Sequence, residues 1–119
     1  MPVTYRISSD VAWLICEREF TYQEFSNALD AAIADPKYST ALPFIFDYRS
    51  YQGDTPQEAI RARADFLSLR RDKMSNRIAI LVADPLHYGL GRMFEVYADH
   101  YGFQTAVFTD PEKALEFLK

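Results

Sequence analysis

The chain has 119 residues, of which 49% are hydrophobic and 25% charged, a balance typical of one globular domain and incompatible with wholesale disorder. Its net charge of −4 argues against a nucleic-acid-binding protein, because such domains usually carry a basic surface. The length fits one domain over residues 1–119. The single cysteine, Cys16, excludes an internal disulfide and a cysteine-based metal site, so we expect a cytoplasmic protein. No apolar stretch approaches the roughly 20 residues that a membrane-spanning helix requires.

The first residues predict a pair of strands. Residues 3–8 and 11–17 are rich in strand-forming side chains and flank the short turn Ser9-Asp10, a pattern typical of a β-hairpin. Apolar residues occupy both faces of the second strand, so we expect it to be covered on both sides. Cys16 then becomes a buried and chemically inert side chain.

A helix and a third strand are predicted next. Thr21 and Glu24 have the spacing of a capping box, which indicates a helix over residues 21–34. The helix ends there because the following residue precedes a proline, which disfavours the helical conformation. Residues 44–48, with the sequence FIFDY, then form a short buried strand.

The second half of the chain alternates helices and strands. Thr55, Pro56 and Glu58 suit the N-cap, N1 and N3 positions of a helix expected over residues 56–73. An almost continuous apolar run over residues 77–83 predicts the fourth strand.

The last predicted elements complete an alternating order. A helix begins at Asp84-Pro85 and ends at Gly102, residues 103–108 form the last strand, and a final helix buries Leu115 and Leu118. The resulting order, ββαβαβαβα, predicts an α/β fold with one mostly parallel five-stranded sheet and helices on its faces. In such sheets, ligands bind beyond the carboxyl ends of the strands.

Catalytic and metal-binding patterns are missing from the sequence. The two histidines, His87 and His100, have no ligand or triad spacing. We expect His87 to be a neutral, solvated imidazole, because the first turn of a helix disfavours a cation. Gly89 and Gly91 do not match a dinucleotide fingerprint and are interpreted as small residues that let the helix approach the sheet. We therefore predict no enzymatic activity, no metal and no cofactor.

The connection after the third predicted strand is the segment where we most expect function. It contains Tyr48, Arg49 and Tyr51, residue types that are enriched at interaction hot spots. An irregular connection packed by its own tyrosines explains the same residues equally well, so both interpretations stay open at this point.

Two arginines occupy unusual positions on the second predicted helix. Arg63 and Arg70 fall in its apolar sector, about 20° apart on a helical wheel. Arginines placed there can line a pocket and hold an anionic group in a bidentate way. The alternative is that their stems cover apolar surface while their heads reach water or a carboxylate.

Three segments resemble a known family: FIFDY, then YRSYQGDTP, and above all RIAILVADPLHYGLGRMFEVYADHYGFQTAVFTDPEKALEFL. With them the chain resembles the SpoIIAA-like branch of the STAS family, the sulfate transporter and anti-sigma factor antagonist proteins, over essentially its whole length. It is most similar to small stand-alone bacterial members described as STAS/SEC14-like. In the antagonists a phosphorylated serine follows an aspartate at the start of the helix after the third strand, where Asp54 and Thr55 stand here. Pro56 and Gln57 depart from that motif, so we interpret Thr55 as a helix cap only.

The resemblance and the missing catalytic motifs favour a non-enzymatic regulatory or partner-binding module. Its expected surface is the carboxyl edge formed by residues 48–55 and 84–88, which include His87 and Tyr88. The alternative is a carrier or sensor of a small apolar or lipid-like ligand, in an aromatic-lined pocket where one of the two arginines meets the polar head. The 8 Tyr, 9 Phe and 1 Trp exceed what one small core needs, so we also predict a homodimer.

Overall fold

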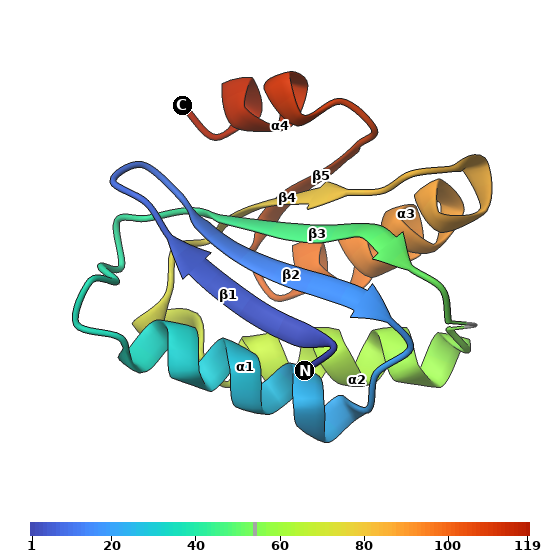
Figure 1. Cartoon of the computed structure of the whole chain (residues 1–119), viewed down its shortest axis with the longest axis horizontal. Helices are drawn as coiled ribbons and strands as arrows, with labels where there is room; N and C mark the ends of the chain where they lie inside the picture. The colour runs from blue at the N-terminus through green and yellow to red at the C-terminus, as the bar shows by residue number, and fades with distance from the viewer. Residues whose placement is uncertain (54) are drawn as a thin grey trace.

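A single sheet organises the chain. Residues 1–53 and 55–119, which the computed structural model describes, form five strands and four α-helices (Figure 1). Their bounds are β1 Val3–Ile7, β2 Ala12–Arg18, α1 Tyr22–Ala34, β3 Phe44–Tyr51, α2 Gln57–Ser68, β4 Arg77–Leu81, α3 Pro85–His100, β5 Gln104–Phe108 and α4 Pro111–Phe117. The strands lie in the order β1-β2-β3-β4-β5, with β1 antiparallel to β2 and the other pairs parallel. The predicted α/β architecture is confirmed.

The helices cover the two faces of the sheet unequally. α1, α2 and α3 pack on one face and bury the larger core, whereas α4 lies by itself on the other (Figure 1). α4 packs on β4 and β5, so Trp13 and Ile15 on the outward face of β2 stay only half-buried. The Arg6 guanidinium lies 5.0 Å from the centre of the Trp13 ring and partly shields it. The expectation that β2 is covered on both sides is met only in part, because Trp13 packs against the smaller core while it and Ile15 stay half-buried.

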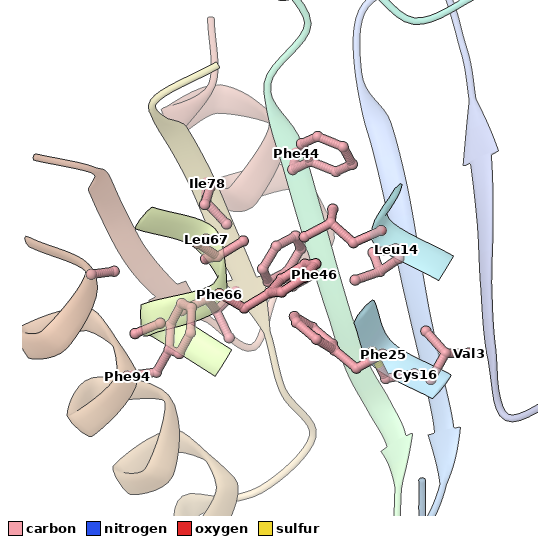
Figure 2. Close-up of a cluster of buried hydrophobic side chains, with 14 of the residues drawn as sticks. Val3, Leu14, Cys16, Phe25, Phe44, Phe46, Phe66, Leu67, Ile78 and Phe94 are labelled. Atoms are coloured by element: carbon pink, nitrogen blue, oxygen red, sulfur yellow. The ribbon is translucent and has the colours of Figure 1, made fainter. Parts of the chain in front are cut away.

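Phenylalanines form much of the larger core (Figure 2). Phe25 meets Phe46 and Phe66 edge to face, with ring centres 6.0 Å and 6.1 Å apart, and such pairs add about 0.5–1.5 kcal/mol beyond the burial of area. The buried phenylalanines are Phe20, Phe25, Phe44, Phe46, Phe66, Phe94 and Phe103. The aromatic content is therefore largely used within one chain and does not by itself call for a second copy.

Local hydrogen bonds set the start of α1 and both ends of α3. The predicted capping box is present: Glu24 N–H donates to Thr21 Oγ1 over 3.1 Å, and Thr21 N–H donates to Glu24 Oε1 over 2.9 Å. Asp84 caps α3, and the chain leaves this helix at Gly102, whose φ of 89° suits glycine. These boundaries follow the sequence because the groups that set them are neighbours along the chain.

The start and end of α2 differ from the prediction. Pro56 is the N-cap residue, and the Thr55 hydroxyl bonds instead to the hydroxyl of Tyr51, 2.6 Å away. The helix ends at Ser68, and a short 3-10 turn, Arg71–Lys73, follows. The interpretation of Thr55 as a helix cap is therefore wrong, because its hydroxyl finds a partner on β3.

β3 continues beyond its predicted end. It runs through Tyr51 rather than stopping at Tyr48, because its last residues pair with Glu17 and Arg18 past an irregularity in β2. The expected loop therefore begins as a strand. Between the pairs Ile15–Asp47 and Glu17–Ser50, β3 advances three residues while β2 advances two. This extra residue places Tyr48 and Tyr51 on the same side of the sheet, although they are an odd number of residues apart.

The final helix also packs differently from the prediction. Ala114 and Leu118 are buried against the smaller core, whereas Leu115 is exposed. Residues 114 and 118 are one helical turn apart and share a face, which residue 115 does not.

Candidate functional site

A pocket opens at the carboxyl edge of the sheet, between the ends of β3 and β4 and the first turns of α2 and α3. Its cavity volume is about 40 Å³, whereas all the space between its atoms, including open solvent, is about 390 Å³. The lining residues are Tyr48, Tyr51, Thr55, Ile60, Arg63, Ile80, Val82, His87, Leu90, Gly91 and Phe94. This is the edge at which open α/β sheets bind ligands.

Arg63 brings a buried positive charge to this pocket. It lies one turn after Ile60 on the inward face of α2, and only 9% of the residue is exposed. Its guanidinium carbon lies 4.6 Å from the ring centre of Phe20 and 5.9 Å from that of Tyr51. Among the described residues, no carboxylate lies within 4.0 Å of an Arg63 nitrogen. Aromatic faces stabilise a cation, and the Tyr51 hydroxyl accepts one hydrogen bond from the Arg63 guanidinium. Within the described residues, the other N–H donors of Arg63 are then available to a ligand.

The rest of the cage holds the guanidinium in place. The rings of Phe25 and Tyr48 each lie 6.0 Å from it, and burial raises the pKa of Tyr48. Burial also raises the pKa of the Cys16 thiol to about 12, so both groups are neutral near pH 7. Cys16 is fully buried, which confirms its predicted place in the core.

His87 forms a second polar group of the pocket, paired with Asp84. His87 Nδ1 lies 2.8 Å from Asp84 Oδ2, and the His87 backbone N–H donates to Asp84 Oδ1 over 2.9 Å. These bonds hold the pKa of Asp84 below its usual range. The His87 side chain is only 15% exposed, so the expectation of a solvated imidazole is wrong. Its ring packs edge-on against Tyr51, with centres 5.6 Å apart, because the first turn of α3 faces the end of β3.

Tyr51 and Thr55 contribute two hydroxyl groups to the wall. They share one hydrogen bond of 2.6 Å, and Tyr51 is only 7% exposed. Tyr48 is half-buried, and its ring lies 5.6 Å from that of Tyr51. Both tyrosines thus lie in the wall of the pocket and are not freely exposed as hot-spot residues of a protein interface.

Other residues considered at the sequence level lie away from the pocket. Arg49 turns to the opposite face of the sheet, where it forms a bidentate pair with Asp47 at 2.9 and 3.0 Å. Arg70 pairs with Asp30 at 2.8 and 3.0 Å and stacks 3.7 Å from the Phe66 ring centre. The two alternatives for the arginines therefore each apply to one of them: Arg63 lines the pocket, and Arg70 reaches a carboxylate.

Tyr88 and Asp54 are the last two residues expected at the site. Tyr88 is 39% exposed at the start of α3 and does not line the pocket. Asp54 lies outside the described residues.

The apolar wall was not predicted as part of a site. Ile80, Val82, Leu90 and Phe94 follow the ordinary periodicity of core residues, and that periodicity does not distinguish a core from a pocket wall. The interpretation as a close-packing residue is confirmed for Gly91, where an added Cβ would lie 3.0 Å from a methyl group of Val107. It is wrong for Gly89, because nothing lies within 4 Å of a Cβ added there.

The site does not have the composition of a metal centre. Within residues 1–53 and 55–119, His, Cys, Asp and Glu side chains nowhere gather in threes in a way that could hold a metal ion. In the same part of the chain, none of the helices combines the length and the apolar character needed to cross a membrane.

Comparison with known proteins places the fold. No family model matches the sequence, and no curated protein matches it. Among solved structures, the chain is similar to an uncharacterised protein of the DUF3478 family with a SpoIIAA-like fold from Shewanella loihica PV-4. The two share 18% sequence identity with a TM-score of 0.65, over 98% of this chain and 92% of the other. The chain therefore has a SpoIIAA-like fold.

Proposed function

We propose that this protein is a STAS-like, non-enzymatic regulatory module of the cytoplasm that binds a small anionic ligand in the pocket at the carboxyl edge. Arg63 is the charged contact, and the apolar residues of β4 and α3 enclose the remainder of the ligand. The observation that carries the proposal is the burial of the Arg63 guanidinium beside open pocket space.

The energetic cost of that burial supports a ligand-binding role. Moving a cation out of water costs several kcal/mol unless an anion and hydrogen bonds compensate. The aromatic rings around Arg63 compensate for only part of this free-energy cost, since a cation–π contact contributes about 0.5–2 kcal/mol. A ligand carboxylate or similar anion that accepts two N–H bonds from the guanidinium compensates for much of the remainder.

The size of the pocket restricts the ligand. A cavity of about 40 Å³ is well below the roughly 150 Å³ that accommodates benzene in an engineered cavity. The enclosed part therefore suits one anionic group with a short apolar extension, while the rest of the ligand occupies the mouth. A long acyl chain does not fit, so the lipid-like version of the ligand hypothesis is the less favoured one.

A pair of arginine variants tests the proposal. Propionate, titrated at constant ionic strength, is expected to raise the Tm of the wild type in proportion to binding and to give a saturable heat in calorimetry. Arg63→Met should abolish both effects. Arg70→Met is the matched control, because Arg70 also stacks on an aromatic ring but is held by Asp30 away from the pocket. Equal binding by wild type and Arg63→Met contradicts the proposal.

A protein partner is the second candidate, favoured by exposed apolar residues beside the pocket. Leu86 and Tyr88, in the first turn of α3, are 66% and 39% exposed. A partner docking there would respond to the state of the pocket, since His87, which lies between them in the sequence, lines the pocket. Pull-down from the native cell is expected to lose the partner with Leu86→Asp/Tyr88→Asp and to keep it with Arg49→Ala on the opposite face. Loss of the partner from Arg49→Ala but not from Leu86→Asp/Tyr88→Asp contradicts this candidate.

We also propose that the chain forms a homodimer through the outer face of α3. Met93 and Val96 are 37% and 70% exposed on neighbouring turns, and exposed apolar patches of this kind mark interfaces. Light scattering should give twice the mass of 13.8 kDa for the wild type and the single mass for Val96→Glu. A wild type that stays monomeric at high concentration contradicts the dimer.

A further inference from the structure

The Asp84–His87 pair determines which hydrogen-bonding atom the pocket offers. A carboxylate only accepts hydrogen bonds, so the 2.8 Å contact between Asp84 Oδ2 and His87 Nδ1 requires the proton to be on Nδ1. In the neutral imidazole, Nε2 then carries the lone pair and accepts. Asp84 is not among the lining residues whereas His87 is, so we infer that the part of the ring away from Asp84, which includes Nε2, borders the pocket.

The hydroxyl pair opposite offers a donor. Tyr51 and Thr55 have one hydroxyl proton each, and their single 2.6 Å bond uses one of them. Within the part of the chain that the structure describes, the second proton has no partner and can be donated to a ligand oxygen. Together with the Arg63 guanidinium, this gives the pocket two donor groups for an anion and one acceptor, His87 Nε2, for a ligand donor.

The charge of the pocket suits a ligand with one negative charge. Arg63 is the lining residue with a permanent positive charge, and the Asp84 carboxylate behind His87 disfavours a second anionic group nearby. Tyr48 also lines the pocket, but its hydroxyl is hydrogen-bonded to the buried Cys16 thiol. The rest of the wall, which includes Ile60, Val82 and Phe94, offers no polar side-chain atom. Dicarboxylates and phosphate esters are therefore poor complements of this site.

We propose that the ligand is a short-chain hydroxy monocarboxylate, whose carboxylate is held by Arg63 and the free hydroxyl proton while its own hydroxyl donates to Nε2 of His87. This inference rests on the proposed function and names its ligand class. The short carbon chain lies against the apolar wall, within the small volume of the pocket. Specificity arises because a ligand without the hydroxyl leaves Nε2 without a partner in a poorly solvated site.

Paired ligands that differ by one hydroxyl test the inference. We would compare lactate with propionate and 3-hydroxybutyrate with butyrate by calorimetry, using each enantiomer of the hydroxy acids, and include malate as a dianion. One enantiomer of at least one hydroxy acid is expected to bind about tenfold more tightly than its deoxy partner, the effect of one satisfied hydrogen bond. Malate is expected to bind more weakly than either hydroxy monocarboxylate.

Two histidine variants identify the group responsible. His87→Phe should reduce the ratio of hydroxy acid to deoxy acid affinity to about one, because the phenyl ring offers no acceptor for the ligand hydroxyl. His100→Phe is the matched control, because His100 is exposed at the far end of α3, and it should keep the wild-type ratio. Circular dichroism verifies the folding of both, and His87→Leu, which also lacks an acceptor, is the substitute if His87→Phe does not fold.

The outcomes separate this inference from the function on which it rests. Equal affinities for lactate and propionate and for 3-hydroxybutyrate and butyrate, or a hydroxyl preference that survives in the His87 variant, overturn the ligand class and leave the anion pocket standing. Failure of every monocarboxylate to bind the wild type overturns the proposed function together with the inference.

Discussion

Replacing Arg63 with methionine should stabilise the protein while removing its ligand binding. Methionine fills a similar volume and makes favourable sulfur–aromatic contacts of about 0.3–1.5 kcal/mol with the rings that surround Arg63. The substitution loses the cation–π attraction of the guanidinium, chiefly to the Phe20 ring at 4.6 Å. This attraction amounts to about 2 kcal/mol in a desolvated site. It also removes the cost of keeping a cation in a residue that is only 9% exposed, which amounts to several kcal/mol.

The balance of these contributions predicts a gain of about 1 kcal/mol in the free energy of unfolding without ligand, or a rise of about 4 °C in Tm for a domain of this size. Urea denaturation followed by circular dichroism measures the first quantity and calorimetry the second. In saturating ligand the order reverses, since only the wild type is stabilised by binding. Arg70→Met, which breaks a partly exposed pair with Asp30, should lose at most about 1 kcal/mol.

A loss of more than about 2 kcal/mol in Arg63→Met would refute this reasoning, because breaking a compensated buried pair costs about 3–5 kcal/mol. The charge would then be satisfied within the folded chain. Restoration of that loss by a second change, Asp54→Asn, would identify the internal counter-ion and remove the basis for an external anion.

Three further outcomes are expected. Thr55→Ala should lose about 1 kcal/mol of stability through its bond to the Tyr51 hydroxyl, whereas the same change in a Tyr51→Phe background should lose much less; additive losses in a double-mutant cycle would exclude the bond as the cause. Gly91→Ala should destabilise the protein by about 1–3 kcal/mol, because the new Cβ meets a valine methyl at 3.0 Å. Gly89→Ala, with open space around its Cβ, should gain up to about 1 kcal/mol of stability. Tm values in the opposite order would contradict the packing. Burial raises the pKa of Cys16 from 9.0 to about 12, so the stabilising contribution of the neutral thiol is present below pH 9 and is lost as the pH rises towards 12. The Tm of Cys16→Ala should therefore decline less steeply over that range than the Tm of the wild type. An identical decline would contradict the burial of the neutral thiol.

The sequence by itself determined the features of this protein that depend on neighbouring residues. The capping box of α1 joins Thr21 to Glu24, and the cap of α3 joins Asp84 to a backbone N–H three residues later. Such bonds form whenever the helix forms, so their spacing predicts the boundaries. The alternating order of strands and helices likewise predicts a parallel sheet, and with it the edge at which the pocket lies.

Only the tertiary structure decided what the polar side chains do. Arg63 and Arg70 share one apolar sector of the predicted helix, yet Arg70 meets Asp30, 40 residues away along the chain, while Arg63 enters a cage built from β2, β3 and α1 and their flanks. Thr55 has the local pattern of a cap, but the extension of β3 brings the Tyr51 hydroxyl within 2.6 Å. A side chain takes whichever partner the packing of distant segments brings closest, and a local pattern contains no information about that distance.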